Sequence, residues 1–132
     1  MPDPSAPMPP SAPAGQDWLA GASPRVRAMC AELRMQLLAW APGVSERIRG
    51  RHAVFSVGRR VFVSLFPQGA RLRLLLNLKR GDLEDPEGVA ESIAGRSHEG
   101  QGDWTVVLAD GRDLERAMPL VRQAFKAAEK RT

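Results

Sequence analysis

The ten residues 95–104, GRSHEGQGDW, hold the residue types that hydrolytic enzymes use for nucleophilic chemistry. Ser97, His98 and Asp103 would supply a nucleophile, a base and an orienting acid. Adjacent side chains such as those of Ser97 and His98 point apart in most backbone conformations, so they rarely converge on one reacting atom. We interpret the segment as a tight loop before a strand and keep an enzymatic or small-molecule site here as a minor alternative.

Glycine spacing in the same segment raises a second possibility, a phosphate-binding loop. Gly95 and Gly100 have the G-x-x-x-x-G spacing, but Gln101 and Gly102 occupy the places of the residues that hold phosphate and magnesium. The segment also precedes a predicted strand, whereas a phosphate-binding loop follows one. The glycines therefore indicate a chain reversal, and we predict no cofactor.

Metal and disulfide chemistry need more ligands than this chain offers. Cys30 is the single cysteine, and His52 and His98 are the two histidines. A single cysteine cannot form an internal disulfide, and a structural zinc site takes four ligands, so we expect neither. Cys30 lies on the apolar side of a predicted helix, which favours a core residue over a nucleophile. We predict no catalytic residue.

Cations alternate with aromatic rings on one face of two predicted strands, which is the pattern of a binding surface. Single-stranded nucleic acid needs both, because phosphates require cations and unstacked bases require flat apolar platforms. The same face would also serve for self-association or for docking to another protein, and an ordinary solvated face has a similar composition. The proposed contacts are Arg60, Phe62, Phe66, Arg71, Arg73 and Lys79.

Charge is distributed unevenly along the chain. The net charge is +4, and residues 25–80 carry twelve Arg or Lys but only two acids, Glu32 and Glu46. Residues 81–120 carry ten acids and three arginines. This asymmetry indicates either a surface that binds polyanions or pairing between the two halves.

The first residues differ in composition from the rest. Residues 1–17 hold six prolines and, after Met1, one large hydrophobe, Met8, so they cannot bury enough apolar surface to offset the entropy of ordering. We predict a disordered tail over 1–22 and a single domain over 23–132. No run of about 18 apolar residues occurs, which predicts no membrane span and, by default, a cytoplasmic protein.

Hydrophobic periodicity predicts an α+β fold with the order α-β-β-β-α-β-α. Ser23 and Pro24 begin a helix over 24–41, and residues 44–49 are interpreted as one further helical turn. An Asp85-Pro86 turn follows the third strand, and Asp110 caps a last helix that Pro119 should kink or split. The predicted sheet is small and antiparallel, with about four strands and both terminal helices on one face. The remaining elements are strands over 52–57, 60–66, 71–79 and 104–109 and a short helix over 89–94.

Alternation along the second strand sets the predicted direction of each side chain. Val61, Val63 and Leu65 should face the helices. Phe62 and Phe66 should then point to the opposite face of the sheet, beside the arginines of the third strand.

Three motifs stand out: an Asp-Pro turn, then a glycine-rich loop with His and Asp, and finally a segment LVRQAF at residues 120–125. Together they resemble an uncharacterised bacterial domain family whose members are often labelled "predicted transport protein". The resemblance implies an accessory module, sometimes joined to nuclease-like domains, and it assigns no catalytic residue. We therefore predict a non-enzymatic binding module with nucleic acid as the favoured partner and protein association as the alternative. The residues of the first two motifs are Asp85, Pro86, His98, Gly100, Gly102 and Asp103.

Overall fold

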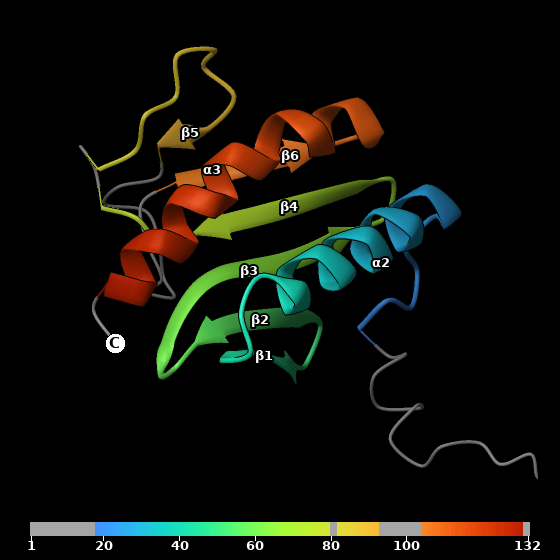
Figure 1. Ribbon diagram of the computed structural model, residues 1–132. Helices are drawn as coiled ribbons and strands as arrows, with labels where there is room; N and C mark the ends of the chain where they lie inside the picture. The colour runs from blue at the N-terminus through green and yellow to red at the C-terminus, as the bar shows by residue number, and fades with distance from the viewer. Residues whose placement is uncertain (1–17, 80–81, 93–103, 131–132) are drawn as a thin grey trace, which may run out of the picture.

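The computed structural model describes residues 18–79, 82–92 and 104–130. It contains two long helices and six strands in this part of the chain (Figure 1). In chain order these are α2 (Pro24–Ala39), β1 (Val44–Arg49), β2 (His52–Val57), β3 (Arg60–Gln68), β4 (Arg71–Leu76), β5 (Glu91–Ser92), β6 (Trp104–Leu108) and α3 (Gly111–Lys130).

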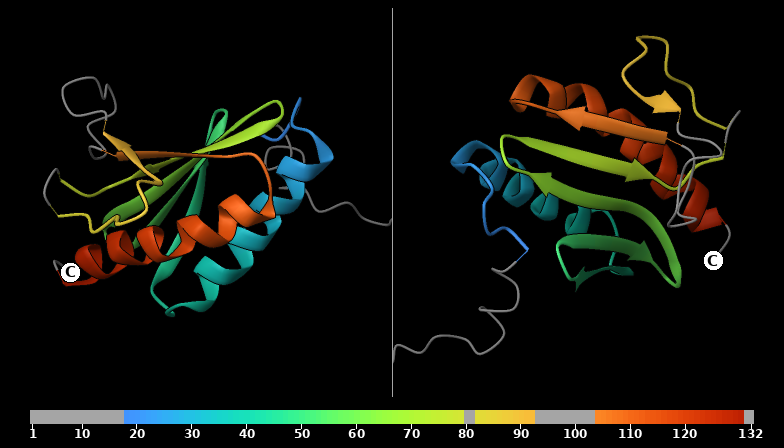
Figure 2. Two further views of the ribbon diagram at one scale, coloured as in Figure 1. Left: turned by 90° about the horizontal axis from the view of Figure 1, so that it is seen from above. Right: turned by 180° about the vertical axis from the view of Figure 1, so that it is seen from behind.

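All six strands form one antiparallel sheet in the order β1-β2-β3-β4-β6-β5. Both helices cover the same face, and no helix lies in front of the other face in the view from behind (Figure 2). The prediction of an α+β fold with an antiparallel sheet and helices on one face is confirmed, with six strands instead of about four. We call the face opposite the helices the open face.

Residues 44–49 form an edge strand, so the prediction of a helical turn there was wrong. Val44 is buried and Ile48 is half-buried, while Ser45, Arg47 and Arg49 are exposed. This period of two is typical of a strand with one buried face. A turn at Gly50, which has φ of +66°, returns the chain into β2.

Phe62 points toward the helices, because a β-bulge interrupts the alternation of β3. Phe55 pairs with Val63, and the next residue, Ser56, pairs with Val61. Phe62 is therefore the extra residue on β3, and it is turned to the same side as Val63. Its ring is fully buried, against the prediction that it lies on the outer face.

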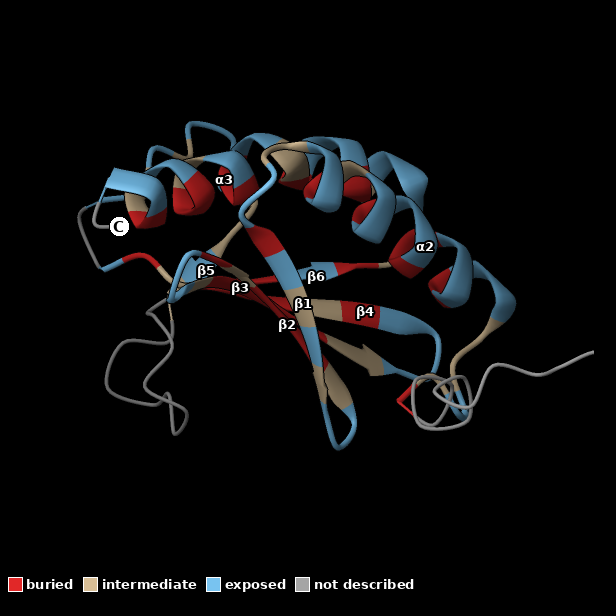
Figure 3. Ribbon diagram, turned by 60° about the horizontal axis from the view of Figure 1, so that its bottom comes forward, coloured by how far each residue is buried: buried red, intermediate tan, exposed pale blue. Residues whose placement is uncertain are grey.

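The core lies between the sheet and the two helices, with the buried positions of each helix turned toward the strands (Figure 3). Phe62 lies within an aromatic cluster, with ring centroids 5.4 Å from Phe125 and 6.4 Å from Trp40. The N-terminus of α2 is capped by the hydroxyl of Ser23, which accepts from the amide of Val26 at 3.2 Å. Trp18 is also buried in this core.

Helix α3 runs through Pro119 without being split, so a kink is the form of that prediction that remains. One other prediction about the C-terminal half was wrong. Residues 89 and 90 are not helical, and Glu91–Ser92 form the short strand β5; residues 93 and 94 lie outside the described part. The division into a tail and a domain at residue 22 stays a prediction.

Candidate functional site

A row of four side chains crosses the open face of the sheet from β1 to β4. Strand pairing places Arg49 beside His52 and Phe66 beside Arg73. The His52 and Phe66 rings stack, with centroids 4.4 Å apart and an interplanar angle of 16°. The guanidinium carbon of Arg73 lies 5.6 Å from the centroid of the Phe66 ring, in the range of a cation–π contact. We call Arg49, His52, Phe66 and Arg73 the basic row.

Two more arginines flank the basic row on the same face. Arg47 precedes Arg49 by two residues on β1, and Arg71 precedes Arg73 by two residues on β4, so each pair points the same way. Arg47, Arg49 and Arg71 are exposed. The open face of β1 to β4 therefore presents four arginines, two on β1 and two on β4, with the His52–Phe66 pair between them.

Strands β1 to β4 contribute no acid to this face. Glu46 is the single acidic residue of the four strands, and it pairs with Phe55, whose ring lies in the core on the helix side. Its carboxylate accepts two hydrogen bonds from Arg34 of α2, at 2.6 and 2.8 Å. The bidentate bond with this carboxylate raises the pKa of Arg34. The acid that could neutralise the open-face arginines is thus engaged on the opposite side of the sheet.

Arg73 is more buried than the other arginines of the open face. Its side chain is half-buried, and its Nε atom is buried without a hydrogen-bond partner among the described residues. A buried donor without an acceptor is costly, so an acceptor that reached it would be favoured.

The structure brings together only half of the predicted contacts. Phe66, Arg71 and Arg73 lie together on the open face, whereas Phe62 is in the core. Arg60 and Lys79 line a small recess with Asp82 and the C-terminal part of α3, away from the basic row. Sequence reasoning missed Arg47, Arg49 and His52; the VSERIR pattern before Gly50 fits a strand that carries the two arginines, but it fits a helical turn as well.

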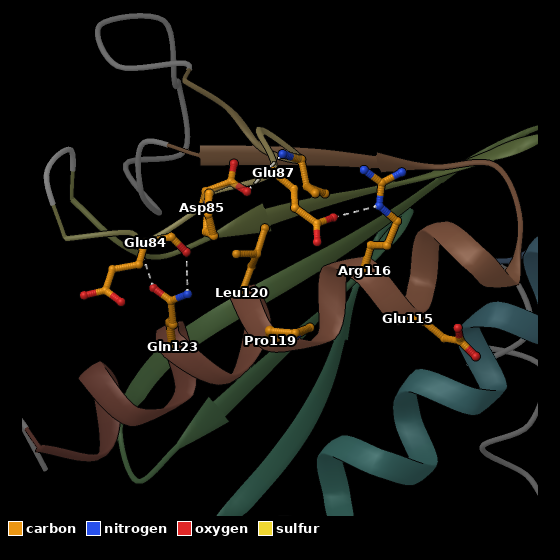
Figure 4. Close-up of a pocket in the computed structure, with 10 residues that line it drawn as sticks. Glu84, Asp85, Glu87, Glu115, Arg116, Pro119, Leu120 and Gln123 are labelled. Atoms are coloured by element: carbon orange, nitrogen blue, oxygen red, sulfur yellow. Dashed lines mark hydrogen bonds and ion pairs between the residues drawn. The ribbon is translucent and has the colours of Figure 1, made fainter.

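A second cavity lies where the acidic loop after β4 meets α3 (Figure 4). It has a volume of about 460 Å³ and combines an apolar floor with acidic and amide groups. Its lining residues are Glu84, Asp85, Pro86, Glu87, Val89, Glu115, Arg116, Pro119, Leu120 and Gln123.

The polar groups of this cavity fasten the loop to the helix. The Gln123 side chain accepts from the amide of Glu84 at 2.8 Å and donates to its carbonyl at 2.7 Å. The carboxylate of Asp85 accepts from the amides of Val89 and Ala90 at 2.9 and 2.8 Å. Figure 4 shows the Glu115 side chain directed away from the loop. Asp85 and Gln123 therefore act as structural residues that hold the loop in place.

Two of the family-like motifs meet at this junction. Asp85 and Pro86 come from the Asp-Pro turn, and Leu120 and Gln123 come from the LVRQAF segment. The third motif is not placed, since His98, Gly100, Gly102 and Asp103 lie outside the described residues. The proposed enzymatic or small-molecule site at 95–104 is untested for the same reason.

Cys30 is a core residue, as predicted. It is fully buried on α2, and burial raises the pKa of its thiol to about 12, which keeps it protonated and unreactive at neutral pH. Over the described ranges, no cluster of three or more potential metal ligands occurs, and no helix is long and apolar enough to cross a bilayer.

Comparisons with known proteins give one distant relative. The chain is 26% identical over 110 residues to an uncharacterised protein of Haemophilus influenzae. The aligned region is 83% of this chain but 36% of the Haemophilus protein, so the chain spans about a third of that relative's length. No protein-family model matches the chain, and no solved structure matches it significantly.

Proposed function

We propose that this protein is a non-enzymatic module that binds single-stranded nucleic acid on the open face of its sheet. The observation that carries the proposal is the basic row, in which an aromatic stack lies between arginines on a face to which β1 to β4 contribute no acid. Phosphates would lie against Arg47, Arg49 and Arg71. Bases would stack beside Phe66 and the guanidinium plane of Arg73.

Residue chemistry favours nucleic acid over other polyanions. An arginine presents planar donors that bind phosphate in bidentate fashion, and its plane also stacks on bases. The side chains of Arg47, Arg49 and Arg71 are exposed and can reach such groups. Aromatic side chains beside the cations add base contacts that a simple phosphate surface lacks.

The shape of the site favours single strands over a duplex. The open face presents a half-buried ring flanked by exposed arginines, beside which an unpaired base can lie. Reading a duplex requires an element that enters a groove, and both long helices are on the other side of the sheet. The resemblance to domains joined to nuclease-like modules supports the same partner, and a cytoplasmic setting is part of this proposal.

Salt dependence is the first test. Fluorescence anisotropy would follow binding of a labelled oligonucleotide of about 20 nucleotides, long enough to cover a site of this kind. If Arg47, Arg49 and Arg71 contact phosphates, the affinity for a single strand should fall about 20-fold between about 50 and 200 mM salt. Affinity that does not change with salt would refute phosphate binding and would favour docking of a protein on this face.

Charge reversal locates the site. The double variant Arg71→Glu/Arg73→Glu should abolish binding. The matched control is Arg112→Glu/Lys126→Glu, which makes the same change in net charge at exposed positions of α3. Equal loss of affinity in both variants would mean that net charge, and not the basic row, attracts the oligonucleotide.

A further inference from the structure

Helix α2 is apolar on two sides. One side packs on the sheet through Val26, Met29, Cys30, Leu33 and Leu37. The other side carries four apolar residues that are all exposed: Ala28, Ala31, Met35 and Leu38.

This second side holds most of the large apolar surface that the described residues expose. Met35 is 64% exposed and Leu38 is 41% exposed, and the third exposed large hydrophobe of the described part is Val107 on the open face. A single exposed hydrophobe is ordinary on a soluble protein. Met35 and Leu38 lie on adjacent turns of one helix, and the two alanines extend them. The four side chains form a continuous apolar stripe that is exposed to water. We call these four residues the α2 stripe.

The spacing of the α2 stripe is that of a helix that pairs with another helix. Its members are separated by three, four and three residues, so they repeat every seven residues as the inner positions of a coiled coil do. The two alanines at the N-terminal end permit close approach of the backbones, and Met35 and Leu38 supply apolar contacts at the other end. A helix that met only solvent on this side would gain nothing from such a repeat.

We propose that the α2 stripe packs against the same stripe of a second copy of this chain, with the two helices parallel. The charged residues beside the stripe favour this arrangement. In a parallel coiled coil, the residue just before the first inner position of a heptad lies beside the residue five places later in the partner helix. Here that first inner position is Ala28. Arg27 would then lie near Glu32 of the partner subunit, and the two-fold axis repeats this contact.

An antiparallel pair fits the charges less well. Matching Ala28 with the partner's Leu38 and Ala31 with the partner's Met35 would bring Glu32 toward its own copy. It would also bring Arg34 toward its own copy, but each Arg34 is paired with Glu46 of its own chain, so the repulsion between the Glu32 side chains is the larger effect. Like charges in these positions are unfavourable, so charge complementarity selects the parallel pair.

This dimer leaves the proposed binding surface free. The exposed side of α2 faces away from the sheet, on the opposite side of the molecule from the open face (Figure 3). Two copies paired through α2 would therefore carry two basic rows. The dimer does not depend on the proposed function, since a monomer could bind an oligonucleotide and a dimer could form without binding one.

Sedimentation of the full chain tests the pairing. We expect a concentration-dependent particle of twice the 14.4 kDa of the chain. The variant Met35→Glu/Leu38→Glu should sediment as a monomer at every concentration. Val107→Glu is the matched control, because it places a carboxylate at the other exposed large hydrophobe and should leave the dimer unchanged. A wild-type chain that is monomeric at high concentration would overturn the proposal, and so would a dimer that Val107→Glu alone disrupts.

Disulfide trapping tests the parallel register without burying a charge. Equivalent inner positions of a parallel pair are close enough for a disulfide, so Ala31→Cys should form a covalent dimer under mild oxidation. Glu129→Cys, exposed near the end of α3, should not. The native Cys30 will not interfere, since its side chain is fully buried. Cross-linking of Glu129→Cys to the same extent as Ala31→Cys, or no cross-linking at Ala31, would rule out this parallel contact.

Discussion

Phe62 and Phe66 lie four residues apart on the same strand, and the structure gives them opposite roles. The Phe62 ring is fully buried and contacts the rings of Trp40 and Phe125. The Phe66 ring is half-buried on the open face, between His52 and Arg73. Replacing each by alanine therefore separates the core from the binding surface.

The expected cost at Phe62 follows from its burial. Truncating a buried phenylalanine to alanine costs about 3–5 kcal/mol, because the lost transfer free energy adds to that of the cavity. Each aromatic pair adds about 0.5–1.5 kcal/mol beyond the buried area, which places Phe62→Ala near the upper end of that range. Phe66→Ala leaves no closed cavity, and we expect a loss of about 1 kcal/mol.

Urea unfolding monitored by circular dichroism measures both changes as free energies of unfolding. A typical domain is stable by about 5–15 kcal/mol, so Phe62→Ala could unfold the chain outright. Phe62→Leu is the milder companion variant, expected to remain folded with a smaller loss than Phe62→Ala. Phe66→Ala should keep the fold and weaken the binding of oligonucleotides.

The reasoning about the bulge would be refuted by equal costs at the two positions. A loss below about 1.5 kcal/mol for Phe62→Ala would mean that this ring is not in the core. Uninterrupted alternation would place both rings on the outer face, so small losses for both variants would mean that the bulge is absent.

Three smaller predictions concern other parts of the fold. The free energy of unfolding should fall as the pH rises above about 9, by up to about 1.4 kcal/mol per pH unit. The reason is that Cys30 ionises in the unfolded state, while burial raises its pKa in the folded state to about 12. Urea unfolding at pH 8 and 10 should show this slope in the wild type and not in Cys30→Ala. Gln123→Ala should cost about 1 kcal/mol and speed hydrogen exchange at the amide of Glu84, whereas unchanged exchange would show that the loop is held by other contacts. Ser23→Ala should lower the free energy of unfolding by about 1 kcal/mol through loss of the cap on α2, with Ser23→Gly costing only a few tenths.

Turns and helix ends were the parts of the fold that sequence reasoning predicted best. Ser23 followed by Pro24 begins α2 as expected, and Gly58 provides the positive φ that the first predicted hairpin needs. These features depend on a few neighbouring residues whose backbone preferences are intrinsic. Residues 44–49 were misread because six residues are too few to distinguish the two-residue repeat of a strand from the 3.6-residue repeat of a helix.

The candidate site was predicted less well, for a reason that involves several strands at once. Phe66, Arg71 and Arg73 were identified because they lie on one hairpin. Arg49 and His52 were missed because they reach the basic row only through pairing of β1 and β2 with the same sheet. Contacts of this kind depend on the register between strands, which no single segment contains.

The amino-acid sequence by itself determined the α+β class, the helices at both ends, the separation of basic from acidic segments and the core position of Cys30. These follow from local periodicity and from residue type. Only the tertiary structure decided which phenylalanine is exposed, because Val61, Phe62 and Val63 are all apolar and either face could have taken them. Packing of Phe62 against Trp40 and Phe125, which come from distant parts of the chain, accompanies the bulge and leaves Phe66 with the arginines on the open face.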